Sequence, residues 1–181
     1  KKYINDQFES LGSNIIRIVP CQILKGGSFS SSGGLSAIRF DIRDVLKLER
    51  MKSALHVVPV FTKSITVSIG KGIEAGNLYA STADIFIALN LKAQYGEIFS
   101  KNDVEKRSKI AVIGPKIAGK LFGSEDQALG RNIKIEGQTF KVSGVLTSKG
   151  GGGFGGPDLD SFVYMPHTTA QVFNTDKKFY V

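Results

Sequence analysis

One stretch of this chain, residues 109–146, constrains the fold more than any other: KIAVIGPKIAGKLFGSEDQALGRNIKIEGQTFKVSGVL. Its opening residues, 109–113, are mostly apolar and predict a strand. Pro115 then suits the first turn of a short helix, and Gly123 suits the end of that helix. Residues 133–136 and 139–146 flank a Glu-Gly-Gln turn and predict a hairpin. A strand, a helix and a hairpin in such close succession indicate a domain of mixed α and β structure.

The same stretch contains most of a phosphate-binding loop. Gly114, Gly119 and Lys120 fit the pattern G-x-x-x-x-G-K, after a strand and at the start of a helix. The magnesium-binding Ser or Thr of that pattern is replaced by Leu121. Pro115 removes one N–H from the cradle that would hold phosphate. We therefore favour a structural helix over a nucleotide-binding enzyme.

The residues before this stretch predict a strand–loop–helix–strand unit. It consists of a strand at 14–20, a Gly/Ser-rich loop at 25–36, a helix at 41–55 with Asp41 as its cap, and a strand at 57–60. A unit of about 45 residues is typical of a βαβ or split βαβ element.

The residues from 61 onward predict short strands and short helices. The strands are expected at 62–69, 77–81 and 162–165, helical turns at 83–89 and from the Ser100–Asp103 capping box, and a further helix after Pro166. Gly70, Gly72 and Gly76 are expected in turns. We therefore expect an α+β fold with two lobes. Residues 1–60 form the βαβ lobe, completed by about 167–181 and further C-terminal residues, and residues 61–166 form an inserted β-rich lobe.

The order and spacing of several short motifs resemble one family. The pattern AVIG-x3-A-x2-LFG, then six residues, then GR-x-I-x-I-x-G-x2-F-x-V-x-GVL is similar to the extracytoplasmic core domain of MacB-type (FtsX-like) ABC transporter permeases. Residues 96–104 and 160–170 match its landmarks upstream and downstream. The resemblance covers about four-fifths of the chain and is strongest over 96–172. The residues that carry it look structural rather than functional: Gly96, Gly114, Leu121, Phe122, Gly123, Gly130, Gly144 and Pro166.

The resemblance implies a location, partners and a role. The domain would lie on the periplasmic or extracellular side of a cell membrane, with the βαβ lobe nearest the membrane. ATP chemistry would belong to a separate cytoplasmic ATPase domain or subunit, and the permease would pair with a second copy. The domain itself would be non-catalytic and would bind no cofactor. It would couple ATP-driven motion of the stalk and membrane helices to substrate export or to control of a partner protein, with an adaptor, a peptide or a lipoprotein as possible contacts.

The net charge of +8 does not by itself indicate a nucleic-acid partner. The basic residues are spread along the chain and form no stripe interleaved with aromatic side chains. No apolar run reaches the roughly 20 residues that span a bilayer, and the ends of the chain are expected to be cut from a longer protein. An alternative function is a secreted peptide- or solute-binding module without membrane helices.

No catalytic or metal site is predicted. The single cysteine, Cys21, lies beside an apolar run and is expected to be a buried, inert thiol. His56, at the end of the first predicted helix, and His167 have no further ligands at the spacing of a zinc site. Asp158 and Asp160 resemble only a fragment of a calcium loop.

Two phenylalanines are candidate partner contacts. Phe29 lies in the Ser/Gly-rich segment, and Phe154 lies in the run GGGGFGG at residues 150–156. Burial of such a ring is worth about 2–3 kcal/mol, so an exposed ring needs a reason. Each ring either folds back onto its own lobe or inserts into a partner, and the sequence leaves both alternatives open.

Overall fold

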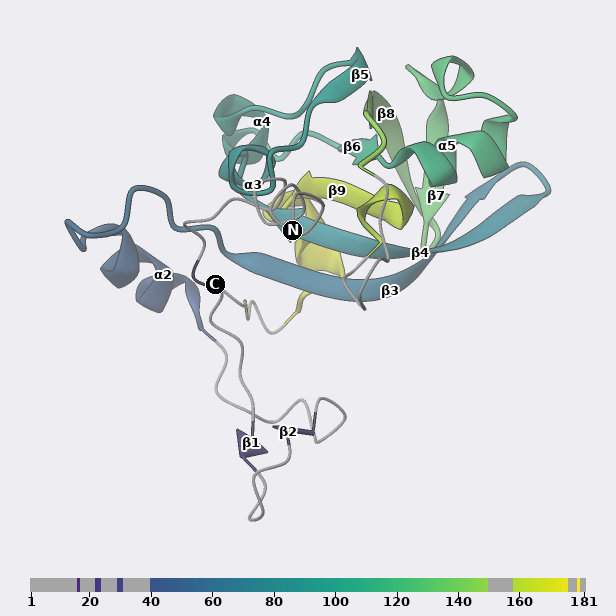
Figure 1. Ribbon diagram of the computed structural model, residues 1–181. Coiled ribbons are helices and arrows are strands. Elements are labelled where there is room, and N and C mark those ends of the chain that lie inside the picture. Colours follow the sequence, from purple (N-terminus) through teal and green to yellow (C-terminus); the bar gives the residue numbers. More distant parts are fainter. Residues whose placement is uncertain are drawn as a thin grey trace, which may run out of the picture.

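The computed structural model describes residues 16, 22–23, 29–30, 40–149, 158–175 and 179. Within them the fold is α+β, a strand-rich body with short helices (Figure 1). Seven strands form its main sheet: β3 (Val60–Ile69), β4 (Gly72–Ser81), β5 (Ala93–Gly96), β6 (Ile110–Ile113), β7 (Asn132–Ile135), β8 (Gln138–Leu146) and β9 (Phe162–Pro166). The two-residue strands β1 (Gln22–Ile23) and β2 (Phe29–Ser30) pair separately. The predicted fold class is confirmed.

The main sheet has the order β5-β8-β6-β9-β4-β3-β7, and β7 also pairs with β8. This extra pairing closes the strands β8, β6, β9, β4, β3 and β7 into a ring, and β5 extends β8 outside it. The pairs β4–β9 and β6–β8 are parallel, and the remaining pairs are antiparallel. The seam between β3 and β7 is short, since only Val67–Ile135 and Ser68–Lys134 pair there.

The ring encloses the main hydrophobic cluster. Alternate residues of its six strands belong to that cluster: Ile65, Val67, Leu78, Ala80, Ala111, Ile113, Ile133, Ile135, Phe140, Val142, Val163 and Met165. This two-residue period places one face of every strand inside the ring. A second cluster covers part of the other face, where Tyr79, Val112 and Tyr164 pack with residues of α3 (Asp84–Ala88) and its neighbours. Burial on both faces explains why several strands read as continuous apolar runs.

The β3–β4 hairpin is longer than the sequence indicates. The predicted strands at 57–60 and 62–69 are wrong as separate elements, because one ten-residue strand starts at Val60 and continues through the predicted lobe boundary near Phe61. The strand predicted at 77–81 extends back to Gly72, so Gly72 and Gly76 lie in β4 rather than in turns. Gly70, with φ +55°, forms the turn. Full pairing with β3 extends the hydrogen-bonded ladder through two glycines of low strand propensity.

The first predicted helix begins where expected and ends early. α2 (Ile42–Glu49) has Asp41 as its N-cap, with a reciprocal capping box to Asp44. It does not continue to Leu55, because Met51 and Leu55 are 51% and 94% exposed and nothing stabilises further turns by packing. Figure 1 shows α2 standing apart from the ring of strands.

Most short elements of the second region are confirmed. α3 lies in the predicted helical turn, α4 (Lys101–Glu105) begins at the Ser100–Asp103 capping box, and α5 (Pro115–Phe122) ends at Gly123 with φ +81°. The predicted hairpin is β7–β8, with positive φ at both Glu136 and Gly137. The helix predicted after Pro166 is a 3₁₀ turn, η4 (Thr169–Val172). β5 was not predicted.

Several predicted segments lie outside the described residues. The strand at 14–20 is described only at Ile16, and the loops at 25–36 and 150–157 are largely outside. The division into two lobes stays a prediction. Among the residues described, no helix is long and apolar enough to cross a membrane.

Candidate functional site

Two polar groups of the segment that resembles a phosphate-binding loop already have partners. The Gly114 N–H donates to the Phe162 carbonyl at 2.8 Å. Lys120 Nζ donates to Glu74 Oε1 at 2.5 Å, which holds the helix against β4. A Cβ at Gly114 would lie 2.6 Å from the Asp160 carbonyl carbon, so the close approach of two backbones requires glycine here. The arrangement docks α5 onto its neighbours and leaves no cradle for a phosphate at Gly114.

Two carboxylates, Asp158 and Asp160, lie just after the Gly-rich segment, and one of them accepts hydrogen bonds from residues just before it. Asp160, 3% exposed, accepts hydrogen bonds from Ser148 Oγ at 2.6 Å and from the Lys149 N–H at 2.9 Å. Asp158 accepts from Lys116 Nζ at 2.6 Å and from Ser161 Oγ at 2.9 Å. The hydrogen bond from Lys116 is the main cause of the lowered pKa of Asp158. These bonds connect residues 148–149 to η3 (Leu159–Ser161) and to α5.

The carboxylates do not form a metal centre in the described part of the chain. No group of three His, Cys, Asp or Glu side chains there could hold a metal ion. His56 lies beyond the shortened α2 and not at its end, and its Nδ1 is 3.2 Å from Asp84 Oδ2. His167 is partly buried, and this burial lowers its pKa. Its ring packs edge-on against that of Phe179, with the ring centroids 5.7 Å apart.

The residues of the family pattern lie at turns and close contacts. Gly96, with φ +68°, and Gly144 allow the backbones of β5 and β8 to cross closely: a Cβ at Gly144 would lie 2.5 Å from the Glu97 carbonyl oxygen. Gly123 and Gly130 have positive φ at the ends of α5 and of η1 (Asp126–Ala128). Pro166 is buried at the end of β9. Their structural roles stay predictions, and these positions are compatible with them.

Leu121 and Phe122 line a surface hollow that the sequence did not indicate. Both are only partly buried, and they pack against the main core cluster. Together with Leu129 and Arg131 they line an open hollow of about 750 Å³. The candidate contact Phe29 lies in β2, where its side chain is not described, and Phe154 lies outside the described residues.

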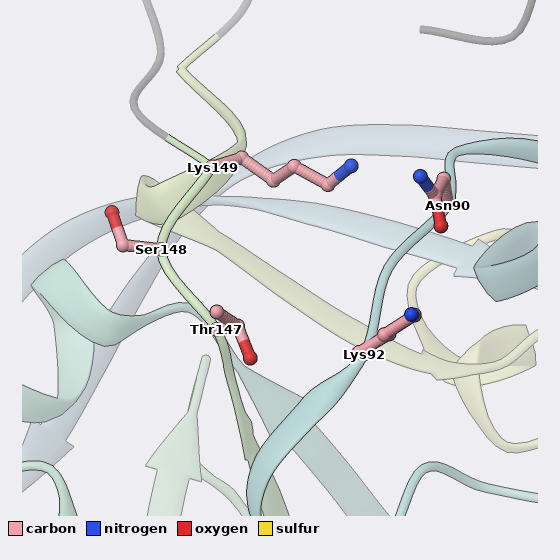
Figure 2. Close-up of a pocket in the computed structure, with 5 residues that line it drawn as sticks. All are labelled: Asn90, Lys92, Thr147, Ser148 and Lys149. Atoms are coloured by element: carbon pink, nitrogen blue, oxygen red, sulfur yellow. The ribbon is translucent and has the colours of Figure 1, made fainter. Parts of the chain in front are cut away.

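A smaller hollow, of about 190 Å³, lies where the segment after α3 meets the end of β8. It is lined by Asn90, Lys92, Thr147, Ser148 and Lys149. Figure 2 shows the Lys149 side chain extending toward Asn90, with Lys92 on the segment facing Thr147, while the Ser148 hydroxyl turns away. Sequence reasoning missed this site because two lysines far apart in the chain carry no local signal. Only the pairing of β5 with β8 brings them together.

The model of the MacB-like periplasmic core domain matches residues 1–181, and the chain belongs to this family. It is 30% identical over 171 residues to the macrolide export ATP-binding/permease protein MacB of Hyphomonas neptunium, covering 92% of this chain and 25% of that protein. It is also 30% identical over 183 residues to the pyoverdine export ATP-binding/permease protein PvdT of Pseudomonas aeruginosa, covering 100% of this chain and 26% of that protein.

Two solved structures have the same fold. The periplasmic region of MacB from Actinobacillus actinomycetemcomitans superposes with a TM-score of 0.73 at 20% identity, covering 98% of this chain and 76% of that one. The extracellular domain of the transporter YknZ from Gram-positive bacteria gives a TM-score of 0.67 at 24% identity, covering 78% of this chain and 70% of that one. The chain spans about a quarter of the length of the curated relatives. It is the extracytoplasmic core domain of a MacB-type ABC transporter permease.

Proposed function

We propose that this domain is a non-catalytic module that couples ATP-driven motion of the permease to substrate export or to control of a partner outside the membrane. The observation that carries the proposal is the closed ring of six strands in a chain of a transporter family. A closed ring with a continuous core resists internal deformation, so force applied at one end moves it as a unit. The relatives named above are ATP-binding/permease proteins for export, which supports export as the activity.

The partners in this proposal are the cytoplasmic ATPase, fused or separate, and a second permease copy. Adaptor proteins, peptides or lipoproteins would meet the domain outside the membrane. No nucleic acid and no cofactor is involved. The engagement of Gly114 with Phe162 and of Lys120 with Glu74 supports a domain that does not itself bind ATP.

The coupling can be tested with a spin label on the ring in the intact transporter. Cys21, the single cysteine of this chain, is replaced by Ser, and the label is placed at Ile73→Cys, where the native side chain is 70% exposed. Electron resonance distances between the two copies should change when ATP binds. The change should disappear in a transporter whose ATPase cannot bind ATP. Distances between the two labels that stay the same when ATP binds would refute mechanical coupling.

The absence of ATP binding by the domain is a separate prediction. Isothermal titration of the chain with Mg-ATP should give no saturable heat, because the Gly114 N–H and the side chains of Lys116 and Lys120 already have partners. Lys120→Ala should change stability through loss of the ion pair with Glu74 but should leave the titration unaltered. A micromolar affinity that Lys120→Ala abolishes would contradict the prediction.

Phe154 and Phe29 are proposed as partner contacts. The buried Asp160 ties residues 148 and 149 to η3, so both ends of the segment that carries Phe154 are anchored to the ring. Phe154→Ala should shift the melting temperature of the domain by only a few degrees and should weaken export or partner capture in the intact assembly. A large loss of stability would assign Phe154 to the core. Unchanged stability together with unchanged export would show that Phe154 has no role in either.

A further inference from the structure

The open hollow at the C-terminal end of α5 has a lining that backbone contacts hold in place. It is formed by Ile69 at the end of β3, by Leu121 and Phe122 of α5, and by Asp126, Gln127, Leu129 and Arg131 in and after η1. A Cβ at Gly72 would lie 3.7 Å from Leu121 Cδ2, so the helix lies against the turn of the β3–β4 hairpin (Figure 1). The Val142 N–H donates to the Arg131 carbonyl at 2.8 Å, which fixes the other side on β8. A ligand would therefore lose little energy in ordering this site.

Four residues of the lining are apolar, and each leaves part of its surface uncovered. Ile69, Leu121 and Phe122 are partly buried. Leu129 is 42% exposed, although its side chain lies against Gly96. The volume of the hollow, about 750 Å³, is within the range of small-ligand sites. An apolar side chain of a ligand would be removed from water here together with these four residues, which favours its entry.

The polar side chains of the lining are available to a ligand. Within the part of the chain that the structure describes, the side chains of Asp126, Gln127 and Arg131 make no hydrogen bond and no ion pair. The lysines of α5, by contrast, are paired with carboxylates. Arg131 is therefore free to bind a carboxylate through two parallel N–H groups, the geometry that makes such pairs strong and specific.

We propose that this hollow binds the C-terminal residue of a peptide when that residue is apolar. Arg131 binds the terminal carboxylate, and the apolar side chain lies against Leu121, Phe122 and Leu129. The Asp126 carboxylate accepts a hydrogen bond from a peptide N–H. A phosphate group suits the hollow less well, because its second negative charge would face Asp126.

The ligand in this proposal is a free peptide rather than a folded partner. A folded protein buries about 800 Å² on each side of a stable interface, far more than the seven residues that line the hollow can cover. Capture of a terminal carboxylate is a recurring mode of peptide recognition. The inference does not depend on the proposed coupling of the domain to ATP, and its failure would leave that coupling untouched.

The test measures the fluorescence anisotropy of a labelled hexapeptide, Gly-Ser-Gly-Ser-Gly-Leu, added to the intact transporter in detergent. The peptide with a free carboxylate should bind saturably, and the same peptide with a C-terminal amide should bind at least about tenfold more weakly. Arg131→Gln should remove this difference by weakening the binding of the acid. The matched control, Lys134→Gln, removes the same charge from an exposed position on β7 and should preserve the difference. No saturable binding, or equal affinity for the acid and the amide, would overturn the site.

A second variant tests the apolar lining without removing a buried side chain. Leu129→Ser changes a position that is 42% exposed, and it should weaken binding of the peptide that ends in Leu while leaving the weaker binding of a peptide that ends in Gly unchanged. Equal effects on the two peptides would contradict contact with the last side chain. Unlabelled hexanoate serves as a competitor. Displacement of the probe by hexanoate as effectively as by the unlabelled peptide would mean that the hollow binds a fatty acid, and would overturn the proposal.

Discussion

Gly114 satisfies two different requirements for glycine. In the sequence it opens a phosphate-loop pattern, and in the fold it lets the chain pass against the backbone of Asp160. The pattern and the close contact both require glycine, but for different reasons: access for a phosphate in one case and access for another backbone in the other. In the sequence, Leu121 in place of Ser or Thr and Pro115 after the glycine favoured the structural role.

This difference predicts opposite effects for two glycines of one segment. Gly114→Ala would force a Cβ against the Asp160 backbone and should lower the free energy of unfolding by about 2–3 kcal/mol. Gly119→Ala lies in α5 with no atom within 4 Å of the added Cβ, and should raise stability by about 0.5–1 kcal/mol. Urea unfolding of both variants measures this. Similar effects at the two positions would refute the close-approach explanation.

The lengths of the helices and strands depended more on what they pack or pair with than on the local sequence pattern. α2 has a complete cap and an apolar stripe, yet it stops at Glu49, where burial of the stripe stops. β4 includes Gly72 and Gly76, which read as turns, because β3 pairs with all ten of its residues. The sequence of β5 shows no alternation of apolar and polar residues. It forms a strand because its backbone pairs with the end of β8.

The tie between α5 and η3 predicts a pH-dependent stability. The pKa of Asp158 is lowered chiefly by its hydrogen bond from Lys116, so the bond stabilises the fold above the unfolded-state pKa of about 3.9 and this contribution is lost as pH falls through the folded-state value. Lys116→Gln should therefore unfold at lower urea than the native chain at pH 7, and the difference should narrow as the pH falls below about 4. The control Lys134→Gln should show no such narrowing. A difference that does not narrow below about pH 4 would contradict this.

For the whole molecule, ring closure is the decisive event, and the β3–β7 seam that takes part in it is short. Two paired positions and the Glu136 side chain, which accepts from the Thr66 N–H at 2.9 Å, connect these strands. Glu136→Ala should speed hydrogen exchange of the Thr66 amide about tenfold or more, because the acceptor is lost. Glu136→Gln keeps an oxygen acceptor at the same position and should exchange nearly as the native chain does. Equal exchange in the two variants would show that the seam does not depend on this bond.

The sequence by itself determined the local events: the caps at Asp41 and Ser100, the end of α5 at Gly123 and the turn at Glu136-Gly137. Each follows from residues within a few positions of one another, where backbone preference and side-chain hydrogen bonds act directly. Only the tertiary structure decided the ring, the length of α2 and the meeting of Lys92 with Lys149. These features depend on which distant segments pair and on how much apolar surface each contact buries. Neither can be deduced from residues that are close together in the sequence.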